Sequence, residues 1–82
     1  MPETTIKISE TDSLLLTYSM LTSRTKVFHN GTELASVPGL GGMTKFEVAG
    51  KKVEVENRIT AMGTNKVTVR IDGDIVGEFN WL

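Results

Sequence analysis

The chain has 82 residues, 39% of them hydrophobic, and a formal net charge of −1 at pH 7. That length gives room for one domain, residues 1–82, without a second core. The small net charge, with both signs interleaved, argues against nucleic-acid binding and against a polybasic membrane surface. The sequence contains no cysteine, which excludes disulfides, thiolate chemistry and cysteine metal sites. We expect no cofactor and no metal.

Neither a signal-peptide pattern nor an apolar run long enough to span a bilayer occurs in the sequence. Together with the absence of cysteine, this favours a cytoplasmic protein.

The first quarter of the chain predicts two strands. Residues 1–5 are polar and expected to be frayed, whereas Ile6 and Ile8 alternate with polar residues over a short strand. After a turn at 10–13, residues 14–21 predict a strand that is apolar on both faces. Its two faces would carry different residues: Leu14, Leu16 and Tyr18 on one, Leu15 and Leu21 on the other.

Asn30-Gly31 is a strong hairpin signal, because both residues tolerate positive φ. A two-residue turn at this point joins strands over 25–29 and 32–36 and places Val27 opposite Leu34. Residues 37–43 follow as a glycine-rich connection that we expect to be irregular.

Residues 44–57 predict the best-specified hairpin of the chain. Apolar and charged residues alternate on both sides of Ala49-Gly50, and a two-residue turn there places Phe46 opposite Val53. On the other face the same register creates two opposite-charge pairs, Lys45 with Glu54 and Glu47 with Lys52. Cross-strand pairs of these kinds contribute about 0.2–1 kcal/mol each, so pattern and charge support one register.

The last hairpin is ambiguous. After a strand end and turn over 58–65, alternation resumes at Val67 and reaches the turn signal Asp72-Gly73. A two-residue turn pairs Val69 with Val76 but points Asp74 and Glu78 inward. A three-residue turn over 72–74 pairs Ile71 with Ile75 and Val67 with Phe79, and we prefer it, with Gly77 as a bulge or a point of close approach.

These elements predict an all-β fold: an antiparallel β-sandwich of seven or eight short strands in consecutive hairpins. A small closed β-barrel is the alternative.

Three segments resemble the Fas apoptotic inhibitory molecule family over residues 25–76. They are the hairpin 26–33, Lys26-Val27-Phe28-His29-Asn30-Gly31-Thr32-Glu33, the hairpin segment 45–52, and the turn 67–74. The resemblance implies a compact antiparallel β-sandwich that acts through protein contacts and has no catalytic residues to carry over. This chain differs in its longer glycine-rich connection at 37–43 and lacks the tryptophans that the family carries in its hairpins.

Little in the sequence points to catalysis. His29 is the only histidine, and beside a turn it is most simply a residue at the end of a surface strand; an acyl-transfer triad would have to use it. The glycine-rich connection lacks the Walker spacing and precedes a strand, which disfavours phosphate binding. Asp72, Asp74 and Glu78 are too few for a calcium loop.

We therefore expect no catalytic and no metal-binding residues, and four candidate partner contacts: Pro38, Leu40, Met43 and Trp81. Trp81 has a default interpretation as a core residue, with partner contact as its alternative. The leading hypothesis is a soluble non-enzymatic interaction module that binds a protein partner or itself. The alternatives are a small-ligand or carbohydrate-binding domain that uses the connection 37–43, and a carboxylate-based enzyme.

Overall fold

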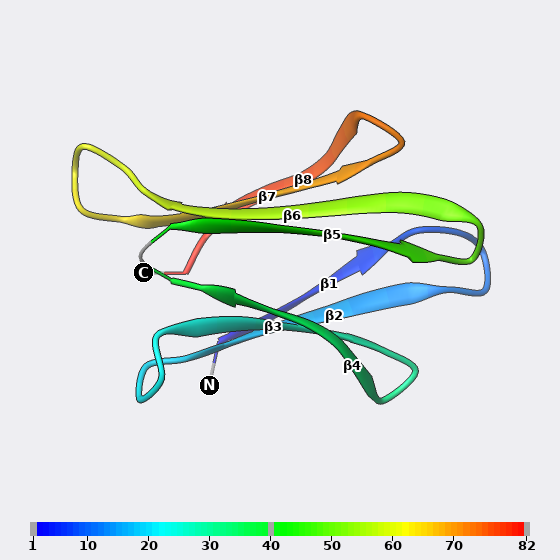
Figure 1. Ribbon diagram of the computed structural model, residues 1–82, viewed down its shortest axis with the longest axis horizontal. Coiled ribbons are helices and arrows are strands. Elements are labelled where there is room, and N and C mark those ends of the chain that lie inside the picture. The colour runs from blue at the N-terminus through cyan, green and yellow to red at the C-terminus, as the bar shows by residue number, and fades with distance from the viewer. Residues whose placement is uncertain (1, 40, 82) are drawn as a thin grey trace.

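The computed structural model describes residues 2–39 and 41–81, which form two antiparallel four-stranded sheets (Figure 1). The first sheet contains β1 (Glu3–Lys7), β2 (Ser13–Ser19), β3 (Arg24–His29) and β4 (Thr32–Pro38), and the second contains β5 (Gly42–Val48), β6 (Lys51–Ile59), β7 (Asn65–Ile71) and β8 (Asp74–Asn80). The two sheets pack face to face without closing, so the sandwich prediction is confirmed and the closed-barrel alternative is wrong. None of the described residues forms a helix that could cross a bilayer.

Each sheet is a simple meander in which every strand pairs with its neighbour in the chain. The connections β2–β3, β4–β5 and β6–β7 therefore lie at one end of the sandwich, the left in Figure 1, which we call the loop end. The connections β1–β2, β3–β4, β5–β6 and β7–β8 lie at the opposite end, the turn end.

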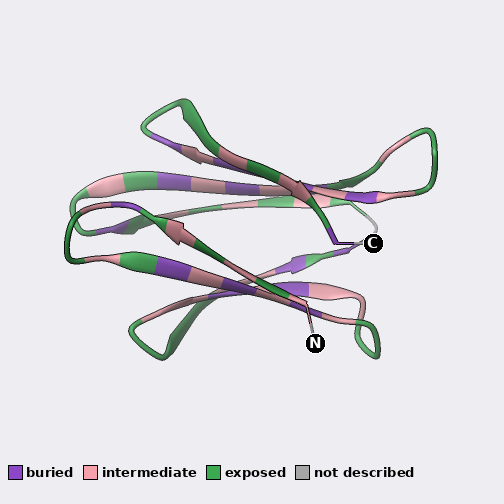
Figure 2. Cartoon of the chain, turned by 180° about the vertical axis from the view of Figure 1, so that it is seen from behind, coloured by how far each residue is buried: buried purple, intermediate pink, exposed green. Residues whose placement is uncertain are grey.

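The core lies between the sheets and is built by alternation, which turns every second residue of a strand inward (Figure 2). Leu14, Leu16 and Tyr18 share the inner face of β2, as predicted. The buried apolar residues are Ile8, Leu14, Leu16, Tyr18, Val27, Val37, Val48, Val53, Val55, Val67, Val69, Ile71 and Trp81.

Trp81 joins the two sheets through a buried hydrogen-bonded group. Its Nε1 donates to Thr25 Oγ1 on β3 at 2.9 Å, and Asn57 Nδ2 on β6 donates to the same oxygen at 2.9 Å. The indole also stacks on Tyr18, with ring centroids 5.8 Å apart, and meets Phe79 edge-on at 4.9 Å. The default interpretation of Trp81 as a core residue is thus confirmed.

The hairpin around Ala49-Gly50 has the predicted register. Phe46 pairs with Val53, and the predicted charge pairs lie opposite one another, with Lys45 Nζ 3.9 Å from Glu54 Oε1. Ala49 and Gly50 have φ values of 53° and 77°, as a type I′ turn requires.

The two other short hairpins are bulged, which the sequence did not predict. Val27 pairs with Ala35 rather than Leu34, because Leu34 is an extra residue between two registers of the β3–β4 ladder. Leu34 lies shortly after the Asn30-Gly31 turn, and the bulge increases the local twist of the two strands.

The β7–β8 hairpin repeats this pattern. Ile71 pairs with Asp74 across a two-residue turn, so the predicted three-residue turn is wrong. Val76 is the extra residue of a bulge, which restores the predicted pair Val67–Phe79. The close approach at Gly77 is confirmed, because a Cβ there would lie 2.6 Å from Ile6 Cδ1 on the facing β1.

Several strand boundaries also differ from the sequence prediction, and Ile8 lies just beyond the end of β1. β1 begins at Glu3, inside the segment that was expected to be frayed, because it pairs in regular register with β2. Leu21 lies outside β2, in the connection to β3. Only 39–41 connect β4 to β5, since the rest of 37–43 extends those two strands.

We expect Thr25→Val to lower the free energy of unfolding by about 2–4 kcal/mol, measured by urea denaturation. The substitution keeps the shape of the side chain but leaves the Trp81 and Asn57 donors buried without an acceptor, at about 1–3 kcal/mol each. Thr32→Val, at an exposed position of β4, is the control and should change stability by less than about 0.5 kcal/mol. Equal effects of both variants would contradict the role of Thr25.

Candidate functional site

The outer face of the second sheet is occupied by charges that pair with one another. Arg70 Nη1 lies 3.4 Å from Glu56 Oε1 and 4.0 Å from Glu54 Oε2, and Lys66 Nζ lies 3.3 Å from Glu78 Oε1. Such exposed pairs contribute little stability individually. These ion pairs keep the outer face of the second sheet hydrated, and they leave few charged side chains without a partner that a ligand could bind.

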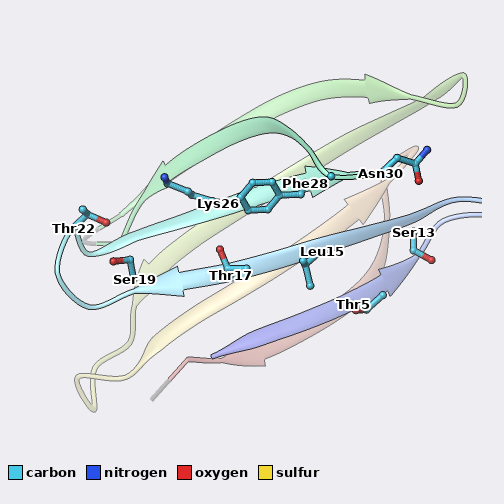
Figure 3. Close-up of a pocket in the computed structure, with 10 residues that line it drawn as sticks. Thr5, Ser13, Leu15, Thr17, Ser19, Thr22, Lys26, Phe28 and Asn30 are labelled. Atoms are coloured by element: carbon cyan, nitrogen blue, oxygen red, sulfur yellow. The ribbon is translucent and has the colours of Figure 1, made fainter. Parts of the chain in front are cut away.

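The outer face of the first sheet differs, because it carries a depression of about 680 Å³ (Figure 3). Leu15 of β2 and Phe28 of β3 are direct cross-strand partners and form its floor. Hydroxyl groups dominate its rim, which also includes one amine and one amide: Thr5, Ser13, Thr17, Ser19, Thr22, Lys26 and Asn30.

This depression could hold a small molecule with one apolar face. Its volume falls within the range of ligand pockets, which combine an apolar floor with a few polar groups. Of the residues that line it, none is acidic. Lys26 is itself paired with Glu33, 3.6 Å away, so the site suits an uncharged, hydroxyl-bearing ligand better than a strong anion.

The loop end presents exposed apolar side chains on both sheets. Met20 and Leu21 in the β2–β3 connection are 67% and 99% exposed, and Met62 in the β6–β7 connection is 91% exposed. We call these three residues the apolar tips. Beside Met20 and Leu21 lies a notch of about 280 Å³, which Pro2 and Tyr18 also line.

The loop end also differs from the turn end in charge. The connections 20–23, 39–41 and 60–64 contain no aspartate or glutamate, and Arg58 lies exposed at the end of β6. At the turn end, the connection before β2 contains Glu10 and Asp12, and the last turn begins with Asp72.

The sequence-predicted contact residues are only partly brought together. Pro38 is exposed where β4 ends at the loop end, and it packs against Gly42 at the start of β5. Met43 is 52% exposed on the outer face of β5, whereas Trp81 is buried. Leu40 lies outside the described residues.

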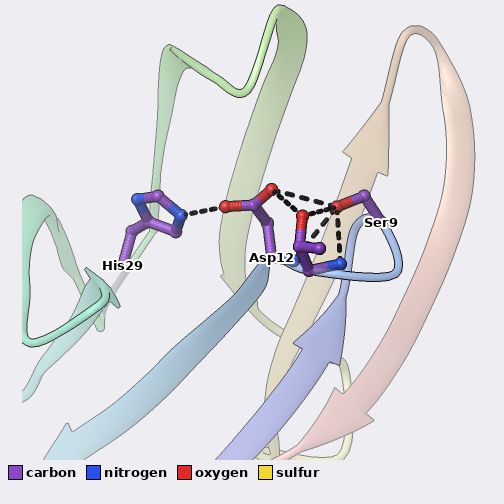
Figure 4. Close-up of polar contacts among 4 residues, drawn as sticks. Ser9, Asp12 and His29 are labelled. Atoms are coloured by element: carbon purple, nitrogen blue, oxygen red, sulfur yellow. Dashed lines mark hydrogen bonds and ion pairs between the residues drawn. The ribbon is translucent and has the colours of Figure 1, made fainter.

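Asp12 and His29 form a polar pair at the turn end (Figure 4). His29 Nε2–H donates to Asp12 Oδ1 at 2.8 Å, because an ionised carboxylate can only accept. Ser9 Oγ and Thr11 Oγ1 both donate to Asp12 Oδ2 at 3.0 Å. These three donors, His29 first, lower the pKa of Asp12.

The order of these groups does not suit hydrolysis. In a triad the serine contacts the imidazole, which takes its proton, and the carboxylate lies behind the imidazole. Here Ser9 contacts Asp12, and the second ring nitrogen of His29 points away from both (Figure 4). The pair therefore fixes the β1–β2 connection against β3.

The acidic residues of the last hairpin are separated from one another. Asp72 Oδ1 accepts from the Lys52 backbone N–H at 3.0 Å, and Glu78 pairs with Lys66. Among residues 2–39 and 41–81, no group of three or more histidine or acidic side chains is placed to hold a metal ion.

Sequence reasoning missed both the depression and the apolar tips. Leu15 and Phe28 were visible as apolar residues on the outward face of their strands, but their pairing depends on the β2–β3 register. Leu21 and Met62 could be recognised as tips only once the strand ends were known.

No protein-family model, curated protein or solved structure matches this chain. The resemblance to the Fas apoptotic inhibitory molecule family stays a prediction.

We expect His29→Ala, which removes the hydrogen-bond donor, to raise the pKa of Asp12 towards its usual value, measured by NMR titration of the Asp12 carboxyl carbon. A lowered pKa stabilises the fold above the unfolded-state pKa, and this contribution is lost as pH falls through the folded-state pKa, below about 4. Asp12→Asn should accordingly cost stability at neutral pH but not in strong acid. An unchanged Asp12 titration in His29→Ala would assign the shift to Thr11 and Ser9 instead.

Proposed function

We propose that this protein is a non-enzymatic interaction module that acts in the cytoplasm and binds a protein partner through its loop end. The observation that carries the proposal is the exposure of the three apolar tips, Met20, Leu21 and Met62, at one end of the sandwich. An almost fully exposed leucine contributes nothing to the fold, whereas burial in a partner would remove its apolar surface from water.

The geometry of the loop end suits a protein surface. The two tip-bearing connections, β2–β3 and β6–β7, project from opposite sheets at the same end of the sandwich (Figure 1). The notch beside Met20 and Leu21 adds a concave apolar element. A recess of this kind can receive an anchoring side chain of a partner, and anchors that fill pockets dominate the binding energy of an interface.

The charge of the loop end narrows the chemistry of the partner. Its connections carry no acidic residue, and no ion pair of Arg58 occurs among the described residues. A partner with an apolar patch surrounded by acidic residues would bury the apolar tips and pair with Arg58 at the same time. Nucleic acid and membrane are not proposed, since a chain of net charge −1 offers no extended basic surface.

We expect Leu21→Ser combined with Met62→Ser to abolish capture of the protein partner from a lysate of the source cell. Loss of a hot-spot side chain costs about 2 kcal/mol or more, which corresponds to a weakening of binding by roughly thirtyfold for each residue at the centre of the interface. The folded stability should change by less than about 0.5 kcal/mol, because both side chains are exposed.

Ile75→Ser is the matched control, because Ile75 is 57% exposed at the turn end. The partner should bind this variant as it binds the wild type. Capture that both variants retain equally would contradict the proposal, and so would binding to anionic vesicles that is lost in the tip variant.

A second candidate function is supported by the depression on the first sheet: binding of a carbohydrate-like ligand. The flat face of Phe28 beside Leu15 offers an apolar floor for a sugar ring, and the surrounding threonine and serine hydroxyls offer partners for its hydroxyl groups. The site lies on β1–β3, away from the connection 37–43 where sequence reasoning located it.

We expect an uncharged sugar from a ligand panel to raise the melting temperature of the wild type, and Phe28→Ala to remove this shift. Phe46→Ala serves as the control, since Phe46 is also a half-buried phenylalanine but lies on the second sheet. No shift with any sugar, or a shift that survives in Phe28→Ala, would exclude this site.

A further inference from the structure

The four edge strands of the sandwich are not equally protected against pairing with another chain. β1 has five residues and follows Pro2. β4 and β8 contain the bulges at Leu34 and Val76, and the Ser36 carbonyl of β4 accepts from Arg24 Nη2 at 3.2 Å. Short length, bulges and capped carbonyls all hinder edge-to-edge pairing. β5 has seven residues in regular register with β6 and none of these devices.

The free backbone groups of β5 can be assigned from its turn. A type I′ turn at Ala49-Gly50 makes Val48 and Lys51 a hydrogen-bonded pair. Bonded and non-bonded pairs alternate along an antiparallel ladder, so Lys45 and Glu47 direct their N–H and C=O groups away from β6.

In the part of the chain that the structure describes, β5 pairs with β6 alone, so the outer edge of residues 44–48 has no paired strand. β4 comes close to β5 near the loop end, where a Cβ on Gly42 would lie 3.0 Å from Pro38 Cδ. From there the two strands diverge towards the turn end (Figure 1).

We propose that β5 pairs antiparallel with β5 of a second copy of this chain, centred on Phe46. In this register Lys45 of each copy lies opposite Glu47 of the other, and both are residues whose backbone groups face outward. The dimer therefore contains two equivalent Lys45–Glu47 pairs. In each pair the two backbones exchange hydrogen bonds and the two side chains carry opposite charges. Registers centred on residue 45 or residue 47 would place like charges directly opposite, which is unfavourable.

The same register matches the remaining side chains. The two Phe46 side chains meet at the two-fold axis on the inner face, where each is only half-buried in the single chain. Met43, 52% exposed on the outer face, lies opposite Ala49 of the second copy. The product is a continuous eight-stranded sheet with the two loop ends pointing in opposite directions.

This homodimer goes beyond the proposed function, because it uses a different surface and leaves the apolar tips free. Met43, a candidate partner contact from the sequence, belongs to this edge.

Charge substitutions at Lys45 and Glu47 test the proposed β5–β5 register, because single variants and their mixture should behave differently. Glu47→Lys alone gives two lysine–lysine contacts across the axis, and Lys45→Glu alone gives two glutamate–glutamate contacts. Each should weaken self-association, measured by analytical ultracentrifugation from micromolar to millimolar concentration, by about tenfold or more. An equimolar mixture of the two variants should dimerise again, because every contact in the mixed dimer joins lysine to glutamate.

Glu78→Lys, which makes the same charge change on the outer face of β8, is the control and should dimerise like the wild type. Amide hydrogen exchange of the wild type is the second measurement. The backbone amides of Lys45 and Glu47 should exchange more slowly as the protein concentration rises, whereas the exchange rates of the amides in the apolar tips should not change.

A wild type that stays monomeric at every concentration would overturn the proposal. So would a mixture of folded variants that fails to associate, or Lys45 and Glu47 amides that exchange equally fast at all concentrations. None of these results depends on capture of a partner by Leu21 and Met62.

Discussion

The hydroxyl of Thr25 is the point on which the arrangement of the two sheets depends. It accepts hydrogen bonds from Asn57 of the opposite sheet and from Trp81 after the last strand. Both donors are buried, so neither can exchange its partner for water without opening the sandwich. Apolar residues on the inner faces supply most of the burial, but they would tolerate sliding of one sheet over the other. The hydrogen bonds to Thr25 fix the relative position of the sheets, and with it the loop end next to them.

Given this fixed core, the two outer faces and the two ends can differ without affecting the fold. The second sheet covers its outer face with paired charges around Arg70, whereas the first leaves Leu15 and Phe28 beside a depression. The turn end carries acidic residues, and the loop end carries the apolar tips. A small domain with little core to spare keeps exposed leucine and methionine only at some cost in solubility. The three most exposed apolar side chains, Met20, Leu21 and Met62, all lie at the loop end, which supports the binding role that we propose for it.

The sequence specified the hairpin around Ala49-Gly50 fully, because alternation, turn residues and the pairs of Lys45 and Glu47 require the same register. It failed at the hairpins where Leu34 and Val76 are inserted. There the turn residues fix one register, the inward-facing residues fix another, and only a bulge satisfies both. The candidate sites were less predictable still. Leu21 continues an apolar run in the sequence, and its exposure becomes apparent only when β2 ends at Ser19.

The two bulged hairpins also explain why one edge remains unprotected. The hairpins β3–β4 and β7–β8 each combine a two-residue turn with an extra residue three positions beyond it. The last strand of each sheet is therefore bulged and twisted, which hinders pairing with another strand. β5 is the first strand of the second meander, and its hairpin satisfies turn, pattern and charge without an insertion. A strand that needs no bulge keeps a regular edge, and its alternating charges then decide what can pair with it. Because Lys45 and Glu47 lie symmetrically about Phe46, β5 is complementary in charge to an antiparallel copy of itself.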